Sequence, residues 1–220
     1  MYLLSEELIF PPVEMANSYG MLAVGGDLSP ERLLLAYKSG IFPWFSEGEP
    51  LIWYSPNPRM VLFPTKVKIS KSMKQVLRKN EFTITFNTNF EEVIRNCKTI
   101  FREDQGGTWI TDEMQQAYIN LHKLGIAKSV EVWQFVDAEK RKKKLIGGLY
   151  GVDLGTVFCG ESMFSSVSNA SKLAFIYLAQ KLEKEHYKLI DCQVHNSHLE
   201  SLGAEEISRT EFLTYIEGLK

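Results

Sequence analysis

Two polar residues stand in a segment that otherwise resembles a buried strand. Asp191 and Gln193 alternate with apolar residues in Ile190-Asp-Cys-Gln-Val194, so a strand would point both side chains to the same face. A carboxylate and an amide placed in this way can orient an amine between them. Alternatively, they only satisfy backbone groups at a strand end, because buried polar groups are usually hydrogen-bonded. The pattern by itself leaves both interpretations open.

A single acidic residue lies among large apolar ones in Phe158-Cys-Gly-Glu-Ser-Met-Phe164. The segment leaves a predicted strand at Gly160, and it suits a pocket with an apolar wall and one charge, Glu161. The commoner arrangement is a strand end with Phe158 and Met163 in the core and an exposed glutamate. The segment is therefore a candidate binding site with a structural alternative.

Two tryptophans follow Pro or lie close to Gly on predicted loops: Trp44 in Phe42-Pro-Trp-Phe45 and Trp109 in Gly106-Gly-Thr-Trp109. An indole on a loop can stack on a nucleobase, which is worth about 1–3 kcal/mol per base. It can equally fill the rim of a core. Spacing alone does not decide between the two.

Basic residues gather along a predicted helix that runs from Ser70 to Asn80. They are Lys71, Lys74, Arg78 and Lys79, and the first three share one helical face. Such a stripe can follow the phosphates of a nucleic acid, with an affinity that falls as salt rises. A solvated helix face is the commoner explanation of a charge run. The Lys140 to Lys144 run is interpreted as a hairpin tip and is assigned no role.

Cysteines and histidines do not form a recognisable reactive or metal-binding motif. The chain has four histidines and three cysteines, without CxxC, HExxH or GxSxG. We expect no metal, no cofactor and no disulfide. The three cysteines are interpreted as small buried or strand residues: Cys97, Cys159 and Cys192.

Composition limits the class of protein. With 220 residues, of which 45% are hydrophobic and 24% charged, the chain can bury one good core and a small second unit. A net charge of -2 means that any nucleic-acid contact is a local patch. No apolar run approaches the roughly 18 residues of a membrane span, and the N-terminus lacks signal-peptide features. We expect a cytoplasmic monomer that does not contact a membrane.

Periodicity and capping residues predict the elements that position these groups. Residues 1–58 are rich in Pro, Gly and aromatics and contain one helix, which begins after Ser29 and ends at Gly40. The remainder alternates helices with a three-strand meander, with Thr156 to Cys159 as its last strand. The predicted helices of this part are 70–80, one that begins at 89, 111–125, 171–187, 197–202 and 210–220. Two further strands are predicted outside the meander, at 82–86 and 189–194. This order predicts an α+β fold with helices on a mostly antiparallel sheet.

The chain resembles the leucyl/phenylalanyl-tRNA–protein transferases through motifs that follow the family order over nearly its whole length. These motifs are Gly25-Gly-Asp-Leu-Ser29, Gly40-Ile-Phe-Pro-Trp-Phe45, Pro58-Arg59, Gly107-Thr-Trp-Ile110, Glu131-Val-Trp133, Gly147-Gly-Leu-Tyr-Gly151, Phe158 to Ser165, Asn169-Ala-Ser-Lys172, Leu189 to Val194 and Ser201-Leu-Gly-Ala204. So many ordered matches are far more specific than any single motif.

The resemblance implies a small N-terminal α/β domain (1–58) and a C-terminal acetyltransferase-like (GNAT) domain (59–220). Such an enzyme moves Leu, Phe and less readily Met from aminoacyl-tRNA, with leucyl-tRNA and phenylalanyl-tRNA as its partners, to proteins that begin with Arg or Lys, in the N-degron degradation pathway. By position, Asp191 and Gln193 match the reaction centre. The residues that match the aminoacyl and adenosine site are Trp44, Trp109, Leu149, Phe158, Glu161, Met163, Phe175 and Ile190. Lys71, Lys74, Arg78 and Lys79 match the tRNA-binding cluster.

Two other functions compete with this one. An acyl-CoA-dependent N-acyltransferase would need a glycine-rich turn that offers backbone amides to a pyrophosphate, and the corresponding turn, Ser165 to Asn169, has no glycine. A non-catalytic tRNA-binding protein would use the basic helix and the tryptophans. It would leave Asp191, Gln193 and Glu161 without a purpose.

Overall fold

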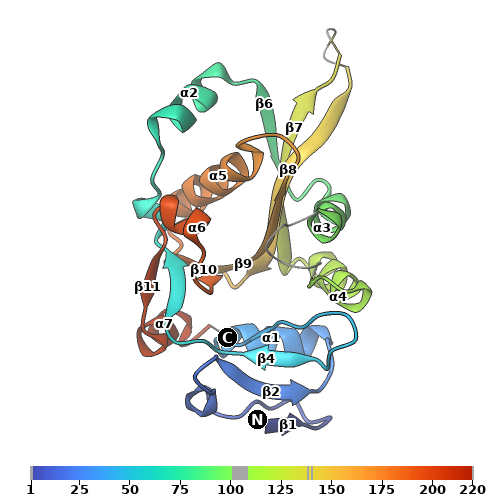
Figure 1. Cartoon of the computed structure of the whole chain (residues 1–220), viewed down its shortest axis with the longest axis vertical. Helices are drawn as coiled ribbons and strands as arrows, with labels where there is room; N and C mark the ends of the chain where they lie inside the picture. Colours follow the sequence, from blue (N-terminus) through green and yellow to red (C-terminus); the bar gives the residue numbers. More distant parts are fainter. Residues whose placement is uncertain (1, 101–108, 138, 140, 220) are drawn as a thin grey trace.

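The computed structural model describes residues 2–100, 109–137, 139 and 141–219, and its N-terminal part forms a small sheet (Figure 1). The strand order is β1-β2-β4-β3. Only β1 and β2 are parallel. The strands are β1 (Tyr2–Leu4), β2 (Met21–Gly25), β3 (Phe42–Pro43) and β4 (Ile52–Tyr54), with a short 3-10 turn, η1 (Val13–Met15), between the first two.

Helix α1 (Pro30–Lys38) lies beside this sheet and begins as the sequence predicts. The Ser29 side chain accepts a hydrogen bond from the Arg32 backbone N–H, and Pro30 occupies the first turn, where its missing N–H costs nothing. Gly40 follows the helix with a φ of 74°, a conformation that favours glycine. The individual strands around α1 were not predicted from the sequence, because each has only two to five residues and shows too little alternation to be recognised.

A larger sheet with the order β11-β5-β10-β9-β8-β7-β6 forms the rest of the framework. All neighbouring pairs are antiparallel except β9 and β10. The mostly antiparallel α+β arrangement is therefore confirmed. The strands are β5 (Arg59–Leu62), β6 (Phe82–Phe86), β7 (Ala127–Phe135), β8 (Lys143–Asp153), β9 (Val157–Ser165), β10 (Leu189–Gln193) and β11 (Glu205–Ile207).

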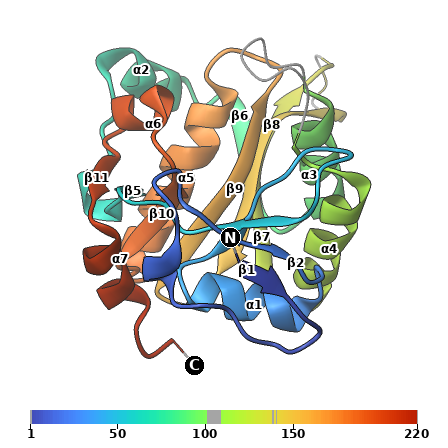
Figure 2. The ribbon, with the colours of Figure 1, turned by 60° about the horizontal axis from the view of Figure 1, so that its bottom comes forward.

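Helices cover both faces of this sheet, as Figures 1 and 2 show. Helix α5 (Ala170–Lys184) connects the parallel strands β9 and β10 and packs on β7, β8 and β9. Helices α3 (Phe90–Thr99) and α4 (Asp112–Lys123) lie on the opposite face. The remaining elements are η2 (Pro64–Lys66), α2 (Lys71–Lys79), α6 (Ser197–Ser201) and α7 (Arg209–Ile216). The side chains of Ser70 and Thr111 accept backbone N–H groups at the starts of α2 and α4.

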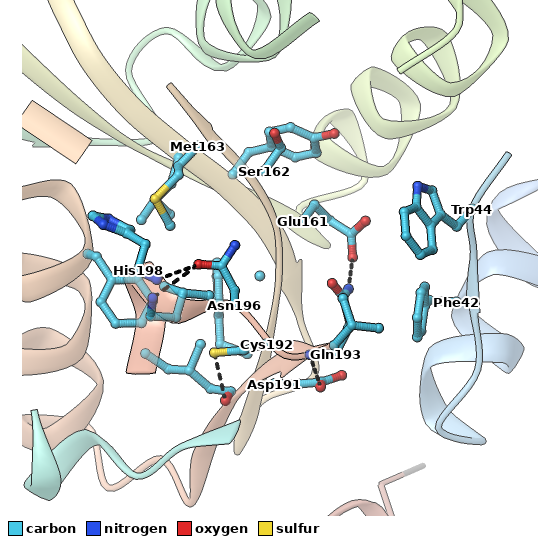
Figure 3. A pocket seen from close by; sticks show the side chains of 18 of the residues that line it. Phe42, Trp44, Glu161, Ser162, Met163, Asp191, Cys192, Gln193, Asn196 and His198 are labelled. Carbon is cyan, nitrogen blue, oxygen red and sulfur yellow. Dashed lines mark hydrogen bonds between the residues drawn. The ribbon is translucent and has the colours of Figure 1, made fainter. Parts of the chain in front are cut away.

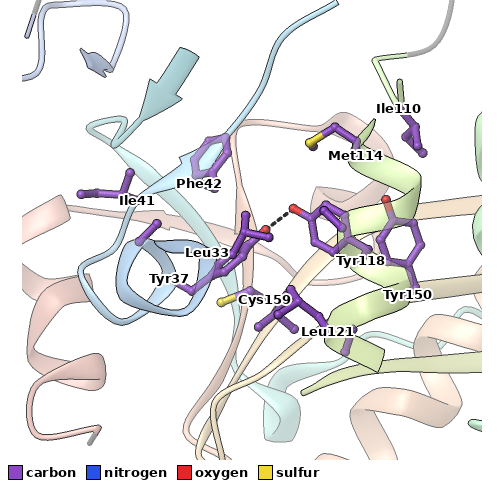
Figure 4. Close-up of a cluster of buried hydrophobic side chains, with 14 of the residues drawn as sticks. Leu33, Tyr37, Ile41, Phe42, Ile110, Met114, Tyr118, Leu121, Tyr150 and Cys159 are labelled. Carbon is purple, nitrogen blue, oxygen red and sulfur yellow. Dashed lines mark hydrogen bonds between the residues drawn. The ribbon is translucent and has the colours of Figure 1, made fainter. Parts of the chain in front are cut away.

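Alternation along the strands divides the buried apolar side chains between two clusters. Phe158 and Ile190 belong to the cluster beneath α5, whereas Cys159 belongs to the cluster that contacts α1, α3, α4 and α7. This second cluster crosses from the N-terminal elements to the large sheet, with Leu33 and Tyr37 of α1 near Met114 and Tyr118 of α4 (Figure 4). The three cysteines are buried, as predicted.

Strand β9 corrects one prediction, since the strand does not end at Cys159. It continues to Ser165, and its pairing with β8 shifts register at one point: Tyr150 faces Ser162 while Gly151 faces Gly160. Glu161 is the extra residue at this irregularity. A bulge re-aims a side chain without ending a strand, so an acidic residue that looked like a strand terminus sits within the sheet.

Candidate active site

A pocket of about 430 Å³ lies where β10 ends beside the middle of β9, next to Phe42, Pro43 and Trp44 of the N-terminal part (Figure 3). All ten residues predicted for the reaction centre and the aminoacyl and adenosine site line it. They are Trp44, Trp109, Leu149, Phe158, Glu161, Met163, Phe175, Ile190, Asp191 and Gln193. These residues are spread over the sequence from 44 to 193, so only the folded chain brings them together.

Asp191 is fully buried and forms an ion pair with Arg59 of β5. Arg59 Nε donates to Oδ1 at 2.8 Å and Nη2 donates to Oδ2 at 2.7 Å, in the paired geometry that makes arginine–carboxylate contacts strong. The guanidinium carbon also lies 4.9 Å from the Phe42 ring centre and 4.5 Å from that of Phe212. The Asp191 carboxylate therefore has a fixed partner, Arg59, that was not predicted from the sequence.

Gln193 lies at the polar end of the pocket and connects two carboxylates. Its backbone N–H donates to Asp191 Oδ1 at 3.0 Å, and its side-chain Nε2 donates to Glu161 Oε1 at 2.9 Å. A register shift separates Asp191 from Gln193 in the pairing with β5, and Gln193 has a φ of 65°. With its amide nitrogen committed to Glu161, Gln193 has its carbonyl oxygen as the group that can accept a hydrogen bond from a substrate.

Glu161 ends a short chain of hydrogen bonds that runs back to α1. Tyr118 of α4 donates its hydroxyl proton to Glu161 Oε2 at 2.9 Å, and the Tyr37 hydroxyl is hydrogen-bonded to that of Tyr118 (Figure 4). Because Tyr118 has one hydroxyl proton and gives it to Glu161, Tyr37 is the donor to Tyr118. Both tyrosines are buried. The N-terminal part of the chain thus helps to orient the acid in the pocket.

Burial raises the pKa of Glu161 from 4.5 to about 7, and the negative charge of Asp191 acts in the same direction. The Tyr37 and Tyr118 hydroxyls and the Gln193 amide oppose the rise, because these polar groups favour the ionised carboxylate. Burial and the charge of Glu161 raise the pKa of both tyrosine hydroxyls well above their ordinary value. Tyr37 and Tyr118 therefore remain protonated donors at neutral pH.

The pocket draws side chains from both sides of β10. Figure 3 shows Asp191 and Gln193 on the side of Phe42 and Trp44, while Cys192 lies on the other side, near His198 and Met163. The predicted shared face of Asp191 and Gln193 is thus confirmed. Ile190 has the parity of Cys192, and it still lines the pocket because the pocket extends around the strand end. Leu149, Phe158 and Phe175 are buried members of the same wall.

The two tryptophans reach the pocket from different parts of the chain, Trp44 from the segment after β3 and Trp109 from the segment before α4. Trp44 is 40% exposed and its ring centre lies 5.7 Å from that of Tyr54. Trp109 lines the pocket and packs partly buried against the apolar core. Trp44 thus presents indole surface beside the polar end of the site, where Figure 3 places it near Glu161.

The predicted tRNA-binding cations lie outside the pocket. Lys71, Lys74, Arg78 and Lys79 are exposed along α2. Among the described residues, no group of three or more His, Cys, Asp or Glu side chains is arranged to hold a metal ion. Within the same residues, every helix is too short or too polar to cross a membrane.

The residues that support the site were not predicted from the sequence. Arg59 carried a usable signal, because it is the one charged residue in the strand Arg59-Met-Val-Leu62. Tyr37 and Tyr118 carried none, since an aromatic residue on the inner face of a helix is normally core. Asn196 and His198 also line the pocket from the segment that enters α6.

Comparison with known proteins identifies the class of enzyme. The family model for leucyl/phenylalanyl-tRNA protein transferase matches residues 61–217, and the model for its N-terminal domain matches residues 26–57. The Flavobacterium johnsoniae protein named leucyl/phenylalanyl-tRNA–protein transferase is 63% identical over 99% of each chain. A Flavobacterium psychrophilum protein of the same name is 56% identical over 99% of this chain and 100% of its own.

The fold has a distant counterpart among solved structures. FemX superposes with a TM-score of 0.50 at 10% identity, over 81% of this chain and 66% of its own.

The family matches show that the chain is an acyltransferase-type enzyme that transfers aminoacyl groups from tRNA to protein. It belongs to the leucyl/phenylalanyl-tRNA–protein transferase family, as its motifs indicated.

Removing the partner of Asp191 will destabilise the fold. An Arg59→Met variant leaves a buried carboxylate without compensation, which typically costs about 3–5 kcal/mol of unfolding free energy. Denaturant unfolding followed by circular dichroism measures the loss. Adding Asp191→Leu to the same variant recovers much of it, because an apolar pair can replace a buried ion pair. Lys66→Met, which breaks the exposed pair with Glu205, serves as control. Equal losses in the two single variants would contradict the central role of Arg59.

The raised pKa of Glu161 predicts a specific pH dependence of stability. The folded protein holds this proton more tightly than the unfolded chain, so ionising Glu161 costs stability as pH rises from about 4.5 to 7. A pKa rise of this size corresponds to about 3 kcal/mol. The measurement is the unfolding free energy of wild type and Glu161→Gln across this range. The unfolding free energy of wild type will fall relative to that of the variant as the pH rises. Parallel curves for the two proteins would show that folding does not raise the pKa of Glu161.

Proposed function

We propose that this enzyme transfers leucine or phenylalanine, and methionine less readily, to the N-terminal α-amine of proteins that begin with Arg or Lys, which marks them for degradation through the N-degron pathway. The observation that carries the proposal is one pocket with two unlike ends. Its apolar wall includes Leu149, Phe158 and Met163, and its polar end holds Gln193 and Glu161. The apolar end suits the side chain of the aminoacyl group, and the polar end suits an incoming amine.

The reaction is the aminolysis of an ester. The nitrogen lone pair of the α-amine forms a bond to the aminoacyl carbonyl carbon, the bond to the 3′ oxygen of the terminal ribose breaks, and the amine proton ends on that oxygen. An α-amine has a pKa of about 7.7–8.0, so part of it is neutral at pH 7 and a strong base is unnecessary. Holding the amine against the ester can supply much of the acceleration.

Gln193 is the residue that we assign to the amine. Its carbonyl oxygen accepts an N–H of the amine, while the bond from Nε2 to Glu161 sets the orientation of the amide. A neutral amide is too weak a base to keep a proton, so Gln193 orients the nucleophile. Asp191 is a positioning residue in this scheme. Both its oxygens accept from Arg59, and Oδ1 also holds the backbone of Gln193.

Donor selection follows from the shape of the apolar wall. Leu, Phe and Met are unbranched at Cβ and can enter a narrow slot, whereas Val and Ile carry a branch that would crowd its entrance. Acceptor selection needs a negative charge near the amine. Asp191 is already paired with Arg59, which leaves Glu161 as the pocket carboxylate that attracts the side chain of an N-terminal Arg or Lys.

Other contacts of the donor tRNA are assigned by position. Trp44 and Trp109 flank the terminal adenosine, and their place on the pocket rim supports stacking on the base. The exposed cations of α2 contact phosphates of the tRNA. We further propose that the enzyme works as a cytoplasmic monomer on leucyl-tRNA and phenylalanyl-tRNA.

The division of the chain into two domains also remains our proposal. Residues 1–58 would form a small α/β domain, and residues 59–220 an acetyltransferase-like (GNAT) domain. Each sheet lies entirely on one side of this boundary, which supports the division. The parallel pair β9 and β10 within an otherwise antiparallel sheet supports the acetyltransferase likeness. The apolar cluster shared by α1 and α4 implies that the two parts are firmly packed.

A transfer assay tests the proposed function. The protein is incubated with radiolabelled Leu-tRNA or Phe-tRNA and with two peptides that differ only in starting with Arg or Ala, without any CoA compound. We expect label on the Arg peptide alone. A Gln193→Ala variant will lose turnover while it keeps tRNA affinity, because its amide orients only the acceptor. Equal label on both peptides would contradict the acceptor assignment, and binding without transfer would favour a tRNA-binding protein.

Neutralising the cations of α2 will weaken tRNA binding in a salt-dependent way. The slope of log Kd against log salt falls by about one for each phosphate that the protein no longer neutralises. Filter binding at several salt concentrations measures the slope for the fourfold Gln variant of Lys71, Lys74, Arg78 and Lys79. A matched variant removes four exposed cations of the β7–β8 hairpin, Arg141, Lys142, Lys143 and Lys144. If the slope of log Kd against log salt were the same for both variants, α2 would not be a specific phosphate-binding site.

A further inference from the structure

A second, smaller pocket of about 190 Å³ lies directly behind the candidate active site. Two residues line both pockets, Phe158 of β9 and Leu178 of α5. Both side chains are buried, with 2% and 4% of their surface exposed. They therefore act as a shared wall, with the apolar end of the active-site pocket on one side and the second pocket on the other.

Contacts on β8 hold the Phe158 ring in this wall. A Cβ atom built on Gly151 would come within 2.5 Å of Phe158 Cε1 and 2.8 Å of Cζ, far closer than van der Waals contact. The ring thus packs directly against the Gly151 backbone, in space that any other residue at this position would occupy. Its location is set by the sheet itself, so a substrate cannot push it aside in that direction.

The spacing of α5 places Leu178 at the junction of the two pockets. Phe175, Leu178 and Leu182 follow one another at intervals of three and four residues, and thus share one helical face. Phe175 lines only the active-site pocket and Leu182 only the second pocket. Leu178 lines both. The helix therefore passes first the active-site pocket and then the second pocket. On the helix side of the wall, Leu178 lies between them.

The second pocket has the size and part of the chemistry of a site for an aromatic ring. Phe86, Val130 and Leu182 extend the apolar surface on its side of the wall, and partly exposed residues such as Lys128 and Asp153 complete the lining. Its 190 Å³ exceeds the roughly 150 Å³ of an engineered apolar cavity in another protein that accommodates benzene. One additional phenyl ring would fit behind the wall.

We propose that Phe158 and Leu178 determine the maximum length of the transferred side chain, and that the second pocket is a latent extension of the donor site for long aromatic side chains. This inference rests on the proposed function, since it assumes that the aminoacyl side chain occupies the apolar wall. The Phe158 ring closes the pocket from the sheet and Leu178 closes it from the helix. Shortening either one joins the two cavities and leaves the reaction centre at Gln193 unchanged.

The experiment compares tRNA acylated chemically with phenylalanine and with 4-phenylphenylalanine, whose second ring projects along the axis of the first. The readout is the ratio of kcat/KM for the long donor over that for phenylalanine, on an Arg-initiated peptide. Because both donors are measured with the same preparation, loss of folded protein cancels in the ratio. We expect Leu178→Ala and Phe158→Leu to raise the ratio by about tenfold or more over wild type, the discrimination that a hydrophobic pocket attains for a small size difference.

Leu182→Ala is the matched control. It makes the same change one turn further along α5 at a residue that is 3% exposed, and it enlarges the second pocket without opening the wall. Its ratio will equal that of wild type. A ratio unchanged in Leu178→Ala and Phe158→Leu, or raised equally in Leu182→Ala, would overturn the proposal. Wild-type protein that transfers no phenylalanine would instead reject the proposed function itself.

Discussion

The buried ion pair between Arg59 and Asp191 is the interaction around which the site is assembled. It joins β5 to β10, and Arg59 Nη1 also donates to the Gly40 carbonyl oxygen at 3.2 Å, which ties the end of α1 to the large sheet. Phe42 and Phe212 cover the guanidinium from the N-terminal part and from α7. Burying two charges is expensive, and the pair contributes little net stability over an apolar replacement. Its value lies in fixing one arrangement of four separate elements.

A continuous series of hydrogen bonds extends from that ion pair through the polar end of the pocket. Asp191 holds the backbone of Gln193, the Gln193 amide bonds to Glu161, and Glu161 receives the Tyr118 hydroxyl. The series starts in β5, crosses β10 and β9, and reaches α4. Rigid elements rather than loops therefore orient each member, which is what a site that works by positioning requires. The raised pKa of Glu161 records the energetic cost of keeping a carboxylate in that place.

The two ends of the pocket reflect the two faces of the large sheet. The α5 face supplies Phe158 and Ile190, because alternate residues of β9 and β10 belong to its apolar cluster, and α5 itself supplies Phe175. The opposite face supplies Asp191 and, through the bulge at Glu161, the acid. The pocket lies where β10 ends beside the middle of β9, so that both faces of the sheet are within reach of one small molecule. An aminoacyl ester can therefore place its side chain among the apolar residues while an amine lies beside the polar ones.

Local chemistry in the sequence determined much of the framework. Ser29, Ser70 and Thr111 cap the helices that follow them, and the period of Phe82 to Phe86 matches strand β6, since capping and alternation depend on near neighbours in the chain. Ordered motifs also indicated the family and the pocket residues.

The length of β9 was not predicted, because a bulge depends on the partner strand. The ion pair of Arg59 with Asp191 spans 132 positions, and the contact of Tyr37 with Tyr118 spans 81. Such contacts, like the wall between the two cavities, exist only once distant segments are packed, so the tertiary structure alone decided them.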